Sequence, residues 1–293
     1  MIFRIKYQTD YRYEQPAYDS VNETRLRPIE CAHQRLLAFR LEVEPKAIID
    51  ETKDRFGNVV HSVTVREPHD RLVITAHSMV ERLDLEPGFA QHVTFKEYLR
   101  KDDQRTHQFA DFLGPTRYIP FSPRLRRCFW SAHPAMEEDV KAYADRIISF
   151  VRDQFGYDRG TTHVHSTVDD ILTSGGGVCQ DFAHLTLGLF RLAGVPARYV
   201  SGYLAPRRAG VGGPPPELAS HAWIEVLLPG LGWTGYDPTH RRRTDRYYIR
   251  IGIGRDYRDV PPVSGFYKTA GGKQKMSFEL SLSEVGADEA LSL

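Results

Sequence analysis

The sequence has few cysteines and no long apolar run, and its charges nearly cancel. Three cysteines, Cys31, Cys128 and Cys179, are too few and too scattered for a disulfide framework or a zinc motif. No apolar run approaches the ~20 residues that a membrane-spanning helix needs, and the start of the chain alternates instead of forming the apolar core of a signal peptide. A formal net charge of +1 gives no bulk attraction to nucleic acid or to an anionic membrane. These absences predict a cytoplasmic protein that binds neither.

The first third of the chain has the pattern of β-strands. Several segments between residues 2 and 81 alternate apolar and polar side chains, and turn residues separate them. This spacing predicts an N-terminal β-sandwich domain, which we place at residues 1–115. We assign residues 116–293, with a late strand at 276–282, to a second domain.

The most informative stretch runs from Gly175 to Leu192. Three glycines precede Cys179, and a helical pattern that is apolar nearly all round then continues to Leu192, which predicts a buried helix. Cys179 therefore begins this helix, where free N–H groups and the helix dipole stabilise a thiolate and could hold an oxyanion. An inert, buried cysteine would fit this stretch equally well.

A histidine and an aspartate follow in an order that suits cysteine chemistry. His221 lies on a predicted strand, and a tight turn at residues 229–232 leads to the next strand, which ends at Asp237. Such a hairpin can bring His221 and Asp237 together, so that one ring nitrogen meets the carboxylate and the other faces Cys179. Taken singly, His221 could be an ordinary edge-strand residue and Asp237 could cap a turn. Their joint occurrence after Cys179 favours a Cys-His-Asp triad.

Other residues near this group carry weaker predictions. Tyr157 and Trp223 could line a substrate pocket or supply a second oxyanion donor, although core packing explains them equally well. His163 and His165 could form a metal-binding pair, but no third ligand has suitable spacing, so we predict no metal site. The glycine- and proline-rich loop at residues 205–219 ends next to His221 and is expected to border the site.

Four motifs resemble the bacterial transglutaminase-like cysteine-enzyme family. They are the segments at residues 177–184, 196–203, 220–223 and 232–239, and segments of the first hundred residues resemble the β domain that precedes the core in that family. The resemblance implies an α+β fold with a papain-like, transglutaminase-like core and a Cys179–His221–Asp237 triad. The sequence departs from the family pattern at Ser174–Gly176 and at His240, where asparagine is usual.

The resemblance implies an enzyme that acts on amide or peptide bonds through a thioester intermediate. Members share a scaffold for proteolysis, amide hydrolysis and acyl transfer, so the substrate stays open. We expect a protease- or amidase-type hydrolase that needs no metal or organic cofactor and takes a peptide or protein amide as its substrate. The alternatives are a protein-glutamine acyltransferase and a non-catalytic peptide-binding module on the same scaffold.

Overall fold

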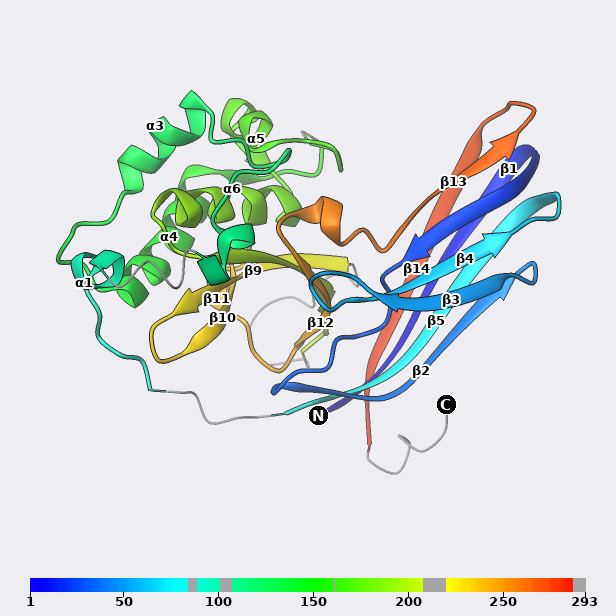
Figure 1. The fold of residues 1–293 in the computed structure, drawn as a ribbon, viewed down its shortest axis with the longest axis horizontal. Coiled ribbons are helices and arrows are strands. Elements are labelled where there is room, and N and C mark those ends of the chain that lie inside the picture. Colours follow the sequence, from blue (N-terminus) through cyan, green and yellow to red (C-terminus); the bar gives the residue numbers. More distant parts are fainter. Residues whose placement is uncertain (84–88, 101–106, 161, 208–219, 287–293) are drawn as a thin grey trace.

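The computed structural model describes residues 1–83, 89–100, 107–160, 162–207 and 220–286. Within these ranges a large antiparallel sheet lies beside a core of helices and strands (Figure 1). Most of the loop expected to border the site, residues 208–219, lies outside the described residues. Where the structure describes the chain, none of the helices is long and apolar enough to cross a membrane.

The N-terminal unit is one curled, seven-stranded sheet. Its strands are β1 (Ile2–Thr24), β2 (Gln34–Glu44), β3 (Ile48–Lys53), β4 (Val59–Val65), β5 (His69–Arg82), β13 (Val263–Thr269) and β14 (Gln274–Val285). The first half of β1 lies between β5 and β14, and its second half lies between β4 and β13. A shift of register between Arg12 and Ala17 separates the two halves. The predicted sandwich is therefore a single sheet whose halves share β1, instead of two separate sheets.

The last two strands return to the beginning of the chain. β13 pairs with residues 17–24 of β1, and β14 pairs with residues 2–13. The late strand therefore belongs to the N-terminal sheet and not to the second domain, where we had placed it. Local sequence could not show this, because a strand's composition does not identify a partner more than 200 residues away in the chain. The boundary near residue 115 stays a prediction.

The second unit is built around α6 (Cys179–Leu192), which packs against a five-stranded antiparallel sheet. The sheet has the order β11 (Arg242–Arg243), β10 (Gly232–Asp237), β9 (Ser220–Leu228), β8 (Ala197–Leu204), β12 (Tyr248–Gly254). The other elements are α1 (Phe95–Arg100), η1 (Ala110–Phe112), α3 (Pro123–Ala132), α4 (Val140–Gln154), β6 (Gly156–Tyr157), α5 (Val168–Ser174), β7 (Gly176–Gly177) and η2 (Tyr257–Asp259). The apolar surface of α6 is buried all round, as its sequence predicts.

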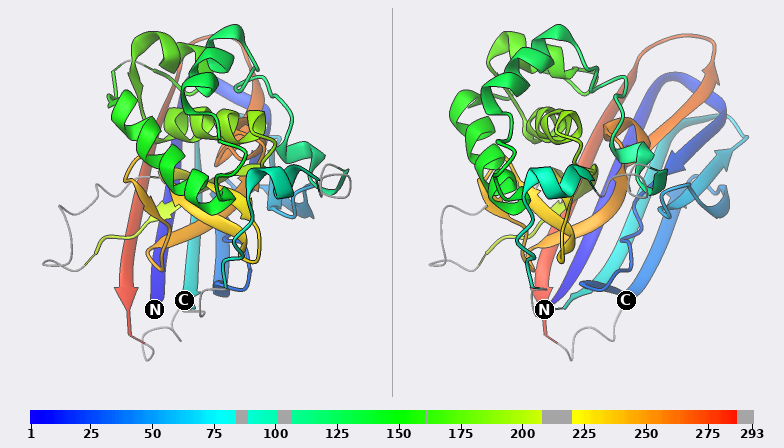
Figure 2. Two further views of the ribbon diagram at one scale, coloured as in Figure 1. Left: turned by 90° about the vertical axis from the view of Figure 1, so that its left-hand side faces the viewer. Right: turned by 60° about the vertical axis from the view of Figure 1, so that its left-hand side comes forward.

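The two units share a core. Alternate residues of β1, among them Phe3 and Ile5, point inward and pack with Tyr203 and Ile249 of the second unit. Figure 2 shows the N-terminal sheet lying along the side of the core sheet that carries β12. The helices pack on the same face of the core sheet, because Tyr199, which lies on the same side of β8 as Tyr203, belongs to the core around α6.

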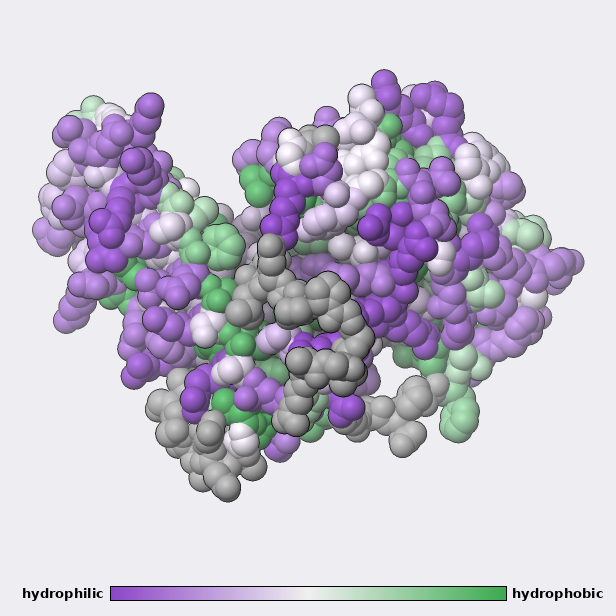
Figure 3. All heavy atoms as spheres, turned by 180° about the vertical axis from the view of Figure 1, so that it is seen from behind, coloured by the Kyte–Doolittle hydropathy of each residue, from purple (hydrophilic) through white to green (hydrophobic). Residues whose placement is uncertain are grey.

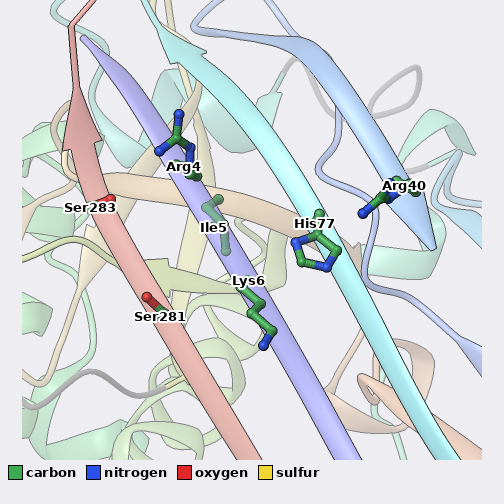
Figure 4. A pocket seen from close by; sticks show the side chains of 7 residues that line it. All are labelled: Arg4, Ile5, Lys6, Arg40, His77, Ser281 and Ser283. Carbon is green, nitrogen blue, oxygen red and sulfur yellow. The ribbon is translucent and has the colours of Figure 1, made fainter. Parts of the chain in front are cut away.

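The outer face of the N-terminal sheet is polar, in keeping with the alternation of its strands. Figure 3 shows the molecule from behind, where hydrophilic residues dominate. A groove on this face has a volume of about 420 Å³ and is lined by side chains such as Lys6, Arg40 and His77 (Figure 4). Arg40 and His77 both contact the carboxylate of Glu42. The groove is formed by β1, β2, β5 and β14, and it contains none of the residues predicted for catalysis.

Candidate active site

The turn before α6 places Cys179 as the first residue of the helix. Gly175 adopts φ +75°, which ends α5, and Gly177 then pairs with Tyr157 in the short parallel ladder of β6 and β7. The carboxylate of Asp181 accepts hydrogen bonds from the Val178 N–H (2.9 Å) and the Thr162 hydroxyl (2.6 Å). Asp181 thus folds back onto the start of its own helix, which fixes the backbone on either side of Cys179.

Only glycine fits at position 177. A Cβ atom there would lie 2.6 Å from the Asp181 Oδ2 atom and 2.8 Å from its Cβ atom, which is closer than real Cβ contacts. We expect Gly177→Ala to displace Asp181 and to destabilise the fold by about 1–3 kcal/mol. Because Cys179 lies two residues away, kcat/KM should fall at least about tenfold. The matched control is Gly156→Ala, since a Cβ atom there would meet its nearest neighbour at 3.8 Å. Equal activity of the two variants, measured under conditions where both are folded, would contradict this account.

The strands β9 and β10 bring the histidine and the aspartate together. They form an antiparallel pair joined by the predicted tight turn. The Nε2 atom of His221 lies 2.8 Å from the Oδ2 atom of Asp237. Asp237 is fully buried, and the side chain of His221 is 9% exposed. An ionised carboxylate can only accept, so Nε2 carries the proton of this bond, and Nδ1 is the ring nitrogen left for the Cys179 thiol, which contacts His221.

Asp237 accepts more hydrogen bonds than the sequence predicts. Besides His221, its Oδ2 atom accepts from the Tyr248 hydroxyl (2.6 Å) and lies 2.7 Å from Nδ1 of His240. Its Oδ1 atom accepts from the backbone N–H groups of Thr239 (2.9 Å) and His240 (3.2 Å). Five donors around one buried carboxylate keep it ionised and fix its orientation.

The charges of this group stabilise one another. Burial acts to raise the pKa of Asp237, but the charge and hydrogen bond of His221, followed by His240, outweigh it and hold this pKa below its usual range. Burial acts to lower the pKa of His221, yet Asp237, with a smaller contribution from Cys179, raises it to about 10. His221 is therefore an imidazolium at neutral pH, in contact with a thiol on one side and a carboxylate on the other.

This raised pKa predicts how stability depends on pH. A histidine whose pKa increases on folding stabilises the folded protein fully below its ordinary value of 6.5, and this contribution is lost as the pH rises toward 10. The difference in free energy of unfolding between wild type and His221→Gln should therefore shrink from pH 6 to pH 10. Urea unfolding of both proteins over this range measures it. A difference that stays constant would show that His221 is not held in its charged form.

The two residues predicted to bind substrate have different surroundings. Tyr157 is 42% exposed and lies beside Gly177, close to the start of α6. Its side chain is therefore accessible to a substrate, and its substrate-binding role stays a prediction. Trp223 is fully buried, and its ring stacks on His221 with centroids 6.2 Å apart. This burial argues against the substrate-binding role predicted for Trp223, because its ring supports His221 from behind.

Two neighbours of Asp237 were not assigned to the site from the sequence. His240 differs from the family pattern in the sequence, but only its contact with Asp237 shows its role in the site. Tyr248 gave no signal, because it lies on β12, which is separated from β10 by β9 and β8. Together with His221 and Asp237, His240 forms a group whose ligand atoms lie within 4.8 Å of one another, close enough for a metal ion. A cation bound by these three residues would take the place of the protons on Nε2 of His221 and Nδ1 of His240 that point toward Asp237.

Comparisons with known proteins agree with this architecture. Residues 3–81 match the profile of the bacterial transglutaminase-like N-terminal region, and residues 132–238 match that of the transglutaminase-like superfamily. An uncharacterized protein of Mycobacterium leprae is 38% identical over 268 residues, which cover 92% of this chain and 94% of that protein. A protein-glutamine gamma-glutamyltransferase of Pseudomonas aeruginosa is 34% identical over 82 residues, or 27% of this chain and 12% of that protein.

A solved structure shares the whole fold. A protein from Cytophaga hutchinsonii, described as a candidate cysteine protease, superposes with a TM-score of 0.76 and 21% sequence identity. The superposition covers 98% of this chain and 92% of the other. Both the N-terminal sheet and the helical core therefore occur together in another protein.

Proposed function

Because this chain belongs to the bacterial transglutaminase-like family, we propose that it is a cysteine enzyme that cleaves amide or peptide bonds through a thioester on Cys179. One observation carries the proposal: Cys179, at the start of a buried helix, contacts His221, which forms an ion pair with the buried Asp237. The cytoplasmic location suggested by the cysteine usage, and a peptide or protein amide as the substrate, belong to the same proposal.

The proposed chemistry follows from these positions. The Cys179 thiolate attacks the amide carbonyl carbon, and the oxyanion accepts hydrogen bonds from N–H groups of the first helical turn, which have no acceptor within the helix. The His221 imidazolium then donates its proton to the leaving amine as the C–N bond breaks, which leaves a thioester. Neutral His221 next removes a proton from water, whose oxygen attacks the thioester and releases the acid. The thiolate and the imidazolium are restored.

Hydrolysis is the simpler fate of this thioester. Water reaches any site open to solvent, whereas transfer to an amine needs an acceptor pocket and the exclusion of water. Transamidation remains the second proposal, since a protein named as a glutamyltransferase shares a short stretch with this chain. A non-catalytic peptide-binding module is a third possibility, but such a module has no need of an ion-paired histidine beside a thiol.

Thiol reactivity separates an enzyme from a binding module. At pH 6 we expect iodoacetamide to label Cys179 before Cys31 and Cys128, because Cys179 begins a buried helix and has the base of the proposed triad, His221, beside it. Cys31 is exposed and serves as the internal reference, whereas burial raises the pKa of Cys128 to about 11 and should keep it unlabelled. Peptide mapping by mass spectrometry measures the order. In His221→Gln the preference for Cys179 should disappear, and equal labelling of Cys179 and Cys31 in wild type would support the binding module.

A peptide-amide library identifies the reaction. Incubation with and without a primary amine, followed by mass detection, distinguishes the hydrolysed product from the transamidated one. A hydrolase gives the acid under both conditions, while a transferase gives the substituted amide when the amine is present. If no peptide changes although Cys179 is selectively labelled, the proposed substrate class is wrong.

A further inference from the structure

The strand β14 forms a long free edge of the N-terminal sheet. Its twelve residues pair with β1 along one side, and no strand among the described residues is hydrogen-bonded to its other side. Figure 2 shows β14, in red, at the end of the row of strands that continues with β1 and β5. Such an edge presents a row of N–H and C=O groups to which another strand can bind.

The apolar row of β14 continues beyond the core. Leu280 and Leu282 pack into the core that the sheet shares with the second unit, but Met276 and Phe278, on the same face, are 57% and 51% exposed. Phe278 stacks on Tyr7 at a centroid distance of 6.2 Å, although half of its surface stays exposed. Large exposed apolar side chains beside a free edge are typical of an interface.

The opposite face of β14 carries two opposite charges at equal distances from Ser277. Lys275 and Glu279 stand two residues before and two residues after Ser277. Neither has an ion-pair partner among the residues that the structure describes. A two-fold axis at Ser277 would place Lys275 of one copy opposite Glu279 of the other, twice.

We propose that β14 pairs antiparallel with β14 of a second copy of this chain, with the two-fold axis beside Ser277. This register also places Met276 opposite Phe278 of the other copy, so that both apolar side chains gain a cross-strand neighbour. A register centred on Phe278 would set Lys275 opposite Ser281 and would leave both charges unpaired. The charges and the apolar side chains of this segment are complementary to those of the same segment in reverse. A second copy of the chain is therefore the partner that we expect to bind this edge.

The first test is the mass in solution. Light scattering after size exclusion, at increasing micromolar concentrations, should show a dimer for wild type and a monomer for Lys275→Glu. The double variant Lys275→Glu/Glu279→Lys restores opposite charges and should again be a dimer. Lys46→Glu is the matched control, because it makes the same charge change between β2 and β3, away from this edge, and should stay dimeric.

The second test fixes the register. In Ser277→Cys the two introduced thiols would face each other with Cα atoms about 4.5–5.5 Å apart, within reach of a disulfide. In Ser281→Cys they would lie about 26 Å apart, since eight residues of strand separate them. Mild oxidation should therefore give a reducible dimer for Ser277→Cys only. A wild type that stays monomeric, a dimer that Lys275→Glu leaves intact, or equal cross-linking of both variants would overturn the proposal.

Discussion

Replacing Cys179 by alanine should reduce turnover to the uncatalysed rate, a loss on the order of 10⁴-fold or more. Of the three cysteines, all of them in the described part of the chain, Cys179 is the one that interacts with His221. An alanine removes one sulfur atom from a partly exposed position. The free energy of unfolding should change by less than about 1 kcal/mol. Turnover of a substrate from the peptide library, together with urea unfolding, measures both effects. Cys31→Ala and Cys128→Ala are the matched controls and should keep wild-type turnover.

A second readout tests the contact between the thiol and the imidazole. Because Cys179 contributes to the raised pKa of His221, that pKa should be lower in Cys179→Ala than the wild-type value of about 10. It should still exceed 6.5, since Asp237 remains. Titration of the imidazole signals by NMR measures this shift. An unchanged pKa of His221 would mean that the thiol and the ring do not interact, whatever happens to turnover.

Asp237→Asn should have the second largest effect, a loss of about 10³–10⁴-fold in kcat/KM. The reason is the number of donors around this carboxylate. If the amide nitrogen takes the place of Oδ2, it faces the donors of His221 and Tyr248. If it takes the place of Oδ1, it faces the backbone N–H groups of Thr239 and His240. In the first orientation His221 must accept at Nε2, and its proton moves to the nitrogen that should serve Cys179.

The same substitution should destabilise the fold by roughly 1–3 kcal/mol, because one buried donor is left without an acceptor in either orientation. Tyr248→Phe is a useful comparison, since it removes one donor from Oδ2 and leaves the carboxylate charged. It should retain kcat/KM within about tenfold of wild type. If Asp237→Asn is as active as Tyr248→Phe, the carboxylate does not set the tautomer of His221.

The predictable part of the site was local. The helix that begins at Cys179 has an apolar pattern and a glycine turn, and the β9–β10 hairpin has a tight turn that fixes its pairing. These signals lie within a few residues of the atoms that they position. They bring His221 and Asp237 to the 2.8 Å contact, and the transglutaminase-like fold that they indicate was confirmed.

The unpredicted part depends on contacts between distant segments. Tyr248 donates a hydrogen bond to Asp237 from a strand that is not a neighbour of β10. The strand β14 pairs with β1, although nearly the whole chain separates them in sequence. Neither residue type nor spacing specifies such partners. Trp223 shows the converse case, because its type suits a pocket wall, but its fully buried position behind His221 depends on packing that the sequence alone does not display.

Because β1 pairs with β13 and β14, the N-terminal sheet can be completed only after the last strands have been synthesised. About 240 residues separate the end of β1 from the start of β13, which a ribosome needs on the order of ten to fifty seconds to add. During that interval one edge of β1 has no partner, whereas the helical core can already close through shorter loops. For most of its synthesis the nascent chain thus exposes an unpaired strand edge that other strands can bind. A chain released from the ribosome before residue 263 would keep this edge of β1 unpaired.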